Sequence, residues 1–137
     1  MNRQEFLDLA EERLREAKCL LDAGLWSGAY YLSGYAVEFC LKAIIARRFV
    51  AEDIPDPKNV QKIWTHDLER LLEIANLESE FEKRAREEER FAANWYRVRG
   101  WNEAARYRII DEEQARRLYG ALSDPNYGVI PWIRSKL

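Results

Sequence analysis

Apolar and small residues recur every three or four positions along residues 25–50, and this stretch contains no proline. The spacing matches the 3.6-residue turn of an α-helix and predicts a helix with a wide buried face. At about 1.5 Å per residue this helix would be roughly 39 Å long, enough to cross a small domain. We therefore predict that residues 25–50 form the central helix of a bundle.

The same periodicity predicts helices on both sides of this central segment. An amphipathic helix over residues 3–23 should end at Gly24, and so short a break favours an antiparallel hairpin with the central helix. A highly charged helix should follow at residues 81–96, then one at 112–122 and a short closing helix at 129–137. A further helix should begin at Leu68, and the predicted N-caps are Thr65 or Asp67, Ser79 with Glu82, and Asp111 with Gln114.

Residues 51–62 lose this periodicity and contain Pro55 and Pro57, so we predict a loop there. No stretch of useful length alternates with the period of a β-strand. The pattern therefore predicts an all-α fold: an up-and-down helical bundle of four to five main helices plus a short C-terminal helix. We expect residues 1–137 to form one domain.

Composition narrows the range of functions. The chain has 137 residues, of which 47% are hydrophobic, and this suffices for one domain with a substantial core. A net charge of −2 does not indicate a nucleic-acid binder, so any basic site must be local. The charged, amphipathic N-terminus and the absence of a long uncharged apolar run predict neither a signal peptide nor a membrane contact. Cys19 and Cys40 stand outside any CxxC pattern, so we expect reduced, semi-buried thiols in a cytoplasmic protein.

Two charged residues interrupt the apolar pattern of the predicted central helix. Glu38 and Lys42 lie four residues apart, which puts both side chains on one helix face. Our main interpretation is an ion pair at the solvated rim of the bundle. The alternative is a partly buried pair that belongs to a functional site or a dimer contact, since an unpaired charge in the core would be costly.

Positive charge and aromatic rings concentrate in residues 95–108, which hold four arginines, two tryptophans and two tyrosines against a single acid. Guanidinium groups can bind phosphate oxygens in a fork, and aromatic rings can stack on bases. The candidate binding residues are Arg97, Arg99, Trp101, Arg106 and Tyr107. Alternatively, the aromatic rings close the end of the bundle and the arginines pair with the glutamates at 87–89.

His66 is the only histidine, and it precedes the helix expected at Leu68. It could contact a nucleotide or act in catalysis, or it could bond to a backbone carbonyl or a neighbouring helix. The sequence has no P-loop, no dinucleotide GxGxxG, no HExxH and no cysteine–histidine cluster with metal-ligand spacing. We therefore expect neither a metal nor a cofactor.

Three segments together resemble the HEPN domain. Residues 24–30 read GLWSGAY, residues 36–43 read AVEFCLKA, and residues 65–68 read THDL. This order is similar to a HEPN pattern in which a helix carrying A-x-E-x-x-L-K-A precedes a loop and an H-x-L at the next helix, and the resemblance covers residues 9–133. It implies a helical protein, often a homodimer, that acts beside a minimal nucleotidyltransferase in toxin–antitoxin or defence systems.

Many HEPN proteins are metal-independent ribonucleases with an arginine followed four to six residues later by a histidine. Here the positions at that spacing before His66 are Asn59, Val60 and Gln61, and no histidine follows the later arginines. The step Arg106–Tyr107 instead resembles an R-Y element of non-catalytic relatives that bind nucleotides or RNA. The leading hypothesis is a non-catalytic nucleotide- or RNA-binding module. The alternatives are a divergent ribonuclease that uses His66 with an arginine of residues 97–108, and a helical protein-interaction domain.

Overall fold

The fold is known from a computed structural model that describes residues 1–49 and 51–137. This part of the chain forms helices connected by turns and contains no strand, as predicted. The elements are α1 (Arg3–Asp22), α2 (Trp26–Ala46), α3 (Pro57–Ile63), α4 (Leu68–Ile74), α5 (Glu78–Glu87), α6 (Glu89–Arg99), the 3-10 helix η1 (Glu103–Tyr107), α7 (Glu112–Ser123) and α8 (Val129–Arg134). The central helix was predicted to extend to Val50, which lies outside the described residues, and α2 ends at Ala46.

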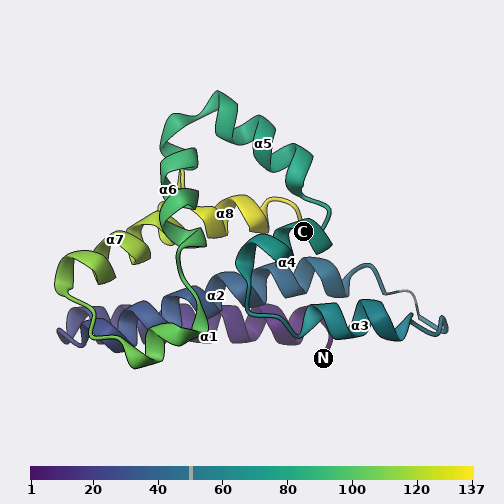
Figure 1. The fold of residues 1–137 in the computed structure, drawn as a ribbon, viewed down its shortest axis with the longest axis horizontal. Helices are drawn as coiled ribbons and strands as arrows, with labels where there is room; N and C mark the ends of the chain where they lie inside the picture. Colours follow the sequence, from purple (N-terminus) through teal and green to yellow (C-terminus); the bar gives the residue numbers. More distant parts are fainter. Residues whose placement is uncertain (50) are drawn as a thin grey trace.

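Helix α2 is the centre of the fold, in agreement with the sequence pattern. It contacts α1, α4, α7, α8 and η1, and α1 runs beside it along most of its length (Figure 1). Its buried face combines small residues with large apolar ones, so neighbouring helices approach closely at some levels and interlock at others. Gly24 ends the turn between α1 and α2 with a φ of 76°, a left-handed conformation that glycine adopts without strain.

Helix starts agree with the predicted caps in two places. The Asp67 carboxylate accepts from the amides of Glu69 and Arg70 at the start of α4. Asp111 and Gln114 form the predicted capping box at the start of α7. Each carboxylate satisfies amide protons that have no partner within the helix.

The predicted loop at residues 51–62 is partly wrong, because α3 forms inside it. Asp56 caps this helix by accepting from the Lys58 amide at 2.9 Å, and Pro57 occupies its first turn. The missing N–H of proline costs nothing at that position, so Pro57 helps the helix begin.

The charged helix expected at residues 81–96 is two helices. The chain turns at Glu88, whose extended φ and ψ of −132° and 103° separate α5 from α6 (Figure 1). The predicted Ser79–Glu82 capping box is also wrong, since α5 begins after Leu77 without a side-chain cap. The turn lets Phe81 of α5 pack on Phe91 and Trp95 of α6, with ring centroids 5.3 and 5.0 Å apart. On a continuous helix, the rise of about 1.5 Å per residue would separate Phe81 from Phe91 by about 15 Å and from Trp95 by about 21 Å, too far for contact.

The two cysteines differ in their surroundings. Cys40 is buried in α2, whereas Cys19 is exposed on α1, so the prediction of two semi-buried thiols is wrong for Cys19. Both are free thiols. Within the described residues, no helix is at once long and apolar enough to cross a membrane.

Candidate functional site

One face of α2 carries Glu38 and Lys42, which the sequence analysis singled out, together with two tyrosines. Tyr31, Tyr35, Glu38 and Lys42 follow each other at spacings of four, three and four residues, which places them along a single helix face. We call these four residues the α2 stripe. Segments far apart in the sequence cover it, as the contacts below show.

Glu38 and Lys42 form a buried ion pair. Their exposed fractions are 1% and 5%, and the Lys42 ammonium donates to Glu38 Oε1 at 2.7 Å. The prediction of an ion pair at the solvated rim is therefore wrong. The apolar face of α2 is wide enough to enclose this level of the helix, and the two charges compensate each other's loss of water.

His66 binds the same carboxylate from the turn before α4. Its Nδ1 lies 3.0 Å from both oxygens of Glu38, and the ring is partly exposed. An ionised carboxylate only accepts hydrogen bonds, so Nδ1 carries the hydrogen and Nε2 is left as an acceptor in the neutral ring. The predicted hydrogen bond to a neighbouring helix is thus present, and it orients the free ring nitrogen.

Tyr35 contacts three other residues of the site: His66, Trp101 and Tyr31. Its ring meets the rings of His66 and Trp101 edge-on, with centroids 5.8 and 5.0 Å away, and its hydroxyl lies 3.3 Å from that of Tyr31. Burial, and then the hydrogen bond to Tyr31, raise the pKa of the Tyr35 hydroxyl above its usual value. This hydroxyl therefore stays protonated over the physiological pH range.

Trp101 supports the site from within the core. It is only 2% exposed, and a Cβ at Gly34 would lie 2.0 Å from two atoms of its ring. Gly34 therefore permits the indole to lie directly against α2. The indole N–H has no hydrogen-bond partner among the described residues. Trp101 was predicted as a binding residue, but so deep a ring offers no face for a base to stack on.

A pocket of about 400 Å³ lies above Trp101, between the start of α4 and the end of α6. It brings His66, Arg99 and Trp101 together, although His66 and Arg99 are 33 positions apart in the sequence. Arg99 pairs with Glu69 at 3.3 Å and lies over the Tyr96 ring, so for Arg99 the alternative of pairing with the glutamates at 87–89 is not the one formed. The remaining lining residues are Thr65, Asp67, Glu69, Asn102 and Glu103.

The charge of this pocket is mixed. Three carboxylates line it against one guanidinium and the His66 ring, and Glu38 lies behind that ring. Such a surrounding favours hydrogen-bond donors of a ligand over a bare phosphate.

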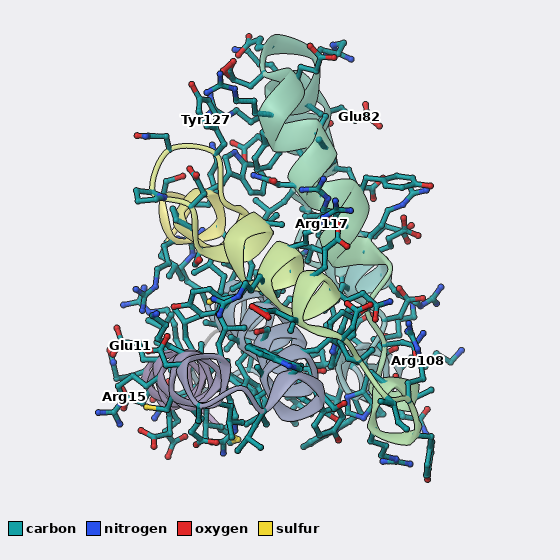
Figure 2. The ribbon with its side chains drawn as sticks, turned by 90° about the vertical axis from the view of Figure 1, so that its left-hand side faces the viewer. Glu11, Arg15, Glu82, Arg108, Arg117 and Tyr127 are labelled. Carbon is teal, nitrogen blue, oxygen red and sulfur yellow. The ribbon has the colours of Figure 1, made fainter. Side chains whose placement is uncertain are left out.

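Two exposed cations lie next to the pocket, Arg106 on η1 and Arg108 directly after it. Asn102 caps this segment by accepting from the Ala104 amide, and the Ser27 hydroxyl accepts from the Ile110 amide at 2.9 Å, so both ends are fixed. Arg106 lies 4.8 Å above the Tyr107 ring, and Arg108 lies 5.8 Å above the Tyr30 ring. Figure 2 shows Arg108 at the outer edge of the molecule.

The charge of Arg106 and the exposure of Tyr107 suit contact with an anionic ligand from solution. The hydroxyl of Tyr107, and then that of Tyr31, raise the pKa of Arg106 above its usual value, so the guanidinium stays charged. Tyr107 is 78% exposed. We call Tyr30, Tyr31, Arg106, Tyr107 and Arg108 the η1 face; Tyr31 is its contact with the α2 stripe.

Arg97 is exposed in the last turn of α6 but is separate from the pocket. Two residues on a helix correspond to about 200° of rotation, so Arg97 and Arg99 point in nearly opposite directions.

The sequence analysis missed Tyr31 and Tyr35 as parts of the site. Their positions, seven and three residues before Glu38 on the same helix face, were the available signal.

The described residues hold no cluster of three or more histidine, cysteine, aspartate or glutamate side chains that could bind a metal ion. In the comparison with protein families, the HEPN domain matches residues 4–123. The chain belongs to the HEPN family. This confirms the resemblance carried by residues 24–30, 36–43 and 65–68.

The comparisons with curated proteins and with solved structures find no match for this HEPN chain. HEPN membership supports, in general terms, a nucleotide- or RNA-related module. The matched residues include His66, the whole pocket and the η1 face.

Proposed function

We propose that this HEPN chain is a non-catalytic module that binds a nucleotide or RNA on the η1 face. The observation that carries the proposal is that Arg106 lies over the exposed Tyr107 ring and Arg108 over the buried Tyr30 ring of α2, on a segment that is held to α2 through Ser27. The guanidinium groups would bind phosphate oxygens, and the exposed Tyr107 ring would stack on a base.

The neighbouring pocket would bind the base or sugar of the same ligand. Its carboxylates disfavour a phosphate, and they accept hydrogen bonds from amino and hydroxyl groups. Arg99 and His66 would contribute donor and acceptor atoms beside them. Arg97 points away from Arg99, so its contribution would be limited to long-range attraction of a longer RNA.

The test is fluorescence anisotropy of labelled single-stranded RNA and of a labelled adenine nucleotide, in excess chelator and over a series of salt concentrations. Arg106→Ala should weaken RNA binding about fivefold to tenfold and reduce the slope of log affinity against log salt by about 0.7, since one phosphate contact is lost. Helicity should not change.

Arg117→Ala is the matched control. Arg117 is another exposed arginine, on α7 (Figure 2), and it pairs with Glu113. This variant should keep the affinity of the wild type. Equal affinity and equal salt slope in the Arg106 and wild-type proteins would refute the assignment of the η1 face.

A divergent ribonuclease is the second candidate function, and the His66–Glu38 hydrogen bond favours it. A carboxylate on Nδ1 orients Nε2 to take a proton from a ribose 2′-hydroxyl, and Arg99 in the same pocket could bind the phosphate after leaving Glu69. End-labelled RNA incubated with the protein in excess chelator separates the two candidates. Cleavage that is lost in His66→Ala would establish the enzyme, whereas intact RNA supports the binding module.

The assembly is part of the same proposal. We propose a homodimer that pairs with a nucleotidyltransferase in a toxin–antitoxin or defence-like system; the support is membership of the HEPN family. Light scattering during size-exclusion chromatography measures the mass of the assembly. A mass of one chain at high micromolar concentration would contradict the homodimer, and co-expression with a nucleotidyltransferase encoded by a neighbouring gene tests the partner.

A further inference from the structure

An open hollow of about 510 Å³ lies along α3 and reaches α4. Three exposed cations line it: Lys58, Lys62 and Arg70. No acidic residue of the described chain lines this hollow, and none of the three cations pairs with a described carboxylate. The remaining lining residues are Gln61, Trp64 and Thr65. We call Lys58, Lys62, Trp64 and Arg70 the α3 patch.

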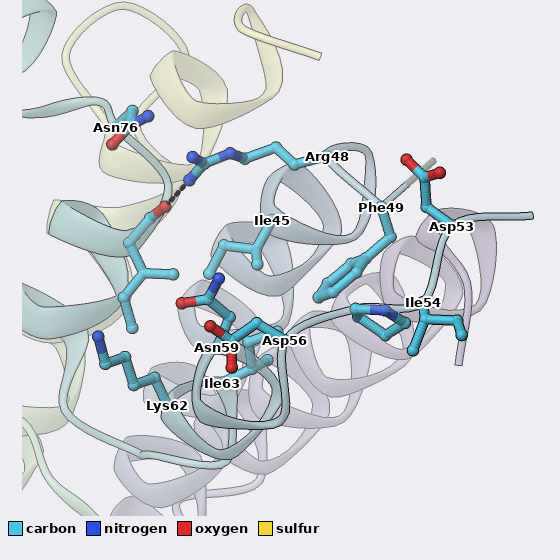
Figure 3. A pocket seen from close by; sticks show the side chains of 12 residues that line it. Ile45, Arg48, Phe49, Asp53, Ile54, Asp56, Asn59, Lys62, Ile63 and Asn76 are labelled. Atoms are coloured by element: carbon cyan, nitrogen blue, oxygen red, sulfur yellow. Dashed lines mark hydrogen bonds between the residues drawn. The ribbon is translucent and has the colours of Figure 1, made fainter. Parts of the chain in front are cut away.

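The acids that are near in the sequence lie outside the α3 patch; they are Asp53, Asp56, Asp67, Glu69 and Glu73. Asp67 and Glu69 line the His66 pocket, where Glu69 pairs with Arg99. Asp53 and Asp56 line a separate cavity between α2, α3 and α4. Figure 3 shows Lys62 at the edge of that cavity, with its ammonium on the opposite side from Asp53. Positive charge is therefore concentrated in the α3 patch.

The spacing of the two lysines suits a chain of phosphates. Lys58 and Lys62 are four residues apart on α3, so they share one helix face with Cβ atoms about 6 Å apart. Both ammonium groups can therefore reach one phosphate, or two successive phosphates of a strand. Arg70 adds a guanidinium from α4 that can bind phosphate oxygens in a fork.

Trp64 gives this patch an aromatic surface. The residue follows the last turn of α3 and is 73% exposed. The Lys42 ammonium lies 5.9 Å from the centroid of its ring, and Glu38 holds this ammonium in the core. The α2 stripe thus positions an indole that is largely in water. An exposed ring of this kind is a surface on which a base can stack.

The α3 patch is continuous with the site already described. Its hollow shares Thr65 with the His66 pocket, and Glu103 at the start of η1 lines the same pocket. Two cationic surfaces, each with an exposed aromatic ring, therefore flank one pocket that is rich in carboxylates.

We propose that the α3 patch binds phosphates and one base of a single-stranded RNA whose other end lies on the η1 face. The strand would cross the His66 pocket with a base or ribose turned into it. This inference rests on the proposed function and names its ligand as an oligonucleotide rather than a mononucleotide. Cations alone would also attract an acidic peptide; the exposed indole and the continuity with the η1 face favour RNA.

The test is fluorescence anisotropy with labelled oligouridylates of three and twelve nucleotides and with a labelled adenine mononucleotide. Lys62→Gln should weaken binding of the twelve-nucleotide RNA about threefold to tenfold and reduce the slope of log affinity against log salt by about 0.7. Binding of the mononucleotide should not change. Lys83→Gln is the matched control, because Lys83 is an exposed lysine on α5 that does not line the hollow.

Trp64→Ala should weaken binding of the long RNA at least about fivefold without changing the salt slope, since stacking carries no charge. Trp64→Phe keeps an aromatic face and should recover most of this loss. Circular dichroism verifies that each variant keeps its helicity.

Three results would overturn the inference: equal affinities of the Lys62 and Lys83 variants for the long RNA, equal affinities of the wild type for the two oligouridylates, or an octaglutamate peptide that displaces the RNA as well as an unlabelled oligouridylate does. RNA binding that depends on Arg106 but not on Lys62 or Trp64 would overturn this inference and leave the proposed function intact. Absence of any RNA or nucleotide binding by the wild type would overturn both.

Discussion

Gly34→Ala should destabilise the protein although alanine favours helices. The added Cβ would lie 2.0 Å from the Trp101 ring, which is rigid and buried, so the indole must move. Overpacking of this kind costs about 3 kcal/mol at the upper end of its usual range. The higher helix propensity of alanine returns about 1 kcal/mol. The net loss is about 2 kcal/mol, which corresponds to a fall in Tm of roughly 7 °C for a chain of this size.

Gly120→Ala is the control for helix propensity. Gly120 lies within α7, and a Cβ there meets no atom within 4 Å. This variant should gain about 0.5 to 1 kcal/mol, so thermal unfolding followed by circular dichroism should separate the two variants by roughly 10 °C. The comparison cancels the propensity term and leaves the contact with Trp101.

A smaller ring provides the second test of the same contact. Gly34→Ala combined with Trp101→Phe should lose less stability than the sum of the single losses, by more than about 1 kcal/mol, because the smaller ring leaves space for the methyl group. Gly34→Ala with a Tm equal to that of Gly120→Ala would refute this placement of Trp101. It would also remove the support that Trp101 gives to the His66 pocket.

Two further predictions concern buried groups of α2. Lys42→Ala leaves the Glu38 carboxylate buried with His66 as its remaining partner, so we expect urea unfolding to show a free energy of unfolding lower by about 3 kcal/mol. The double variant Glu38→Gln with Lys42→Met should recover part of this stability. An unchanged urea midpoint in Lys42→Ala would contradict the buried pair. Burial raises the pKa of the Cys40 thiol to about 12, so at pH 8 its thiolate fraction is about one in ten thousand. An aromatic disulfide reagent should therefore modify the exposed Cys19 quickly and Cys40 only after unfolding, and fast reaction of two thiols in the folded protein would contradict this burial.

The periodicity of the sequence predicted the large elements because the buried face of a helix appears in its own sequence, as apolar residues every three or four positions. Residues 25–50 placed α2 at the centre, and Asp67 and Asp111 marked true helix starts. The errors arose where tertiary contacts decide the local structure. The break at Glu88 is stabilised by the contact of Phe81 with α6, and nothing within five residues of Glu88 in the sequence indicates that contact.

The site was predictable as a set of residues but only partly as an arrangement. Composition indicated the arginines and tyrosines of residues 95–108, and the single histidine stood out. The burial of Glu38 and Lys42 depends on the turn before α4, which covers them only after the chain has folded. The opposite directions of Arg97 and Arg99 follow from helix geometry once α6 is known to include both.

Glu38 joins two of the segments that carry the family resemblance. Its carboxylate binds Lys42 within AVEFCLKA and His66 within THDL, so one side chain connects α2 to the start of α4. Substitutions at Glu38 will therefore change folding and binding together, and a loss of function there does not identify a ligand contact. Arg106 is exposed and contributes little to the packing, so Arg106→Ala separates binding from folding. The proposed function is accordingly tested on the η1 face. For the role of His66, the His66→Ala variant is compared with Glu38→Gln, which keeps the shape of the carboxylate while removing its charge.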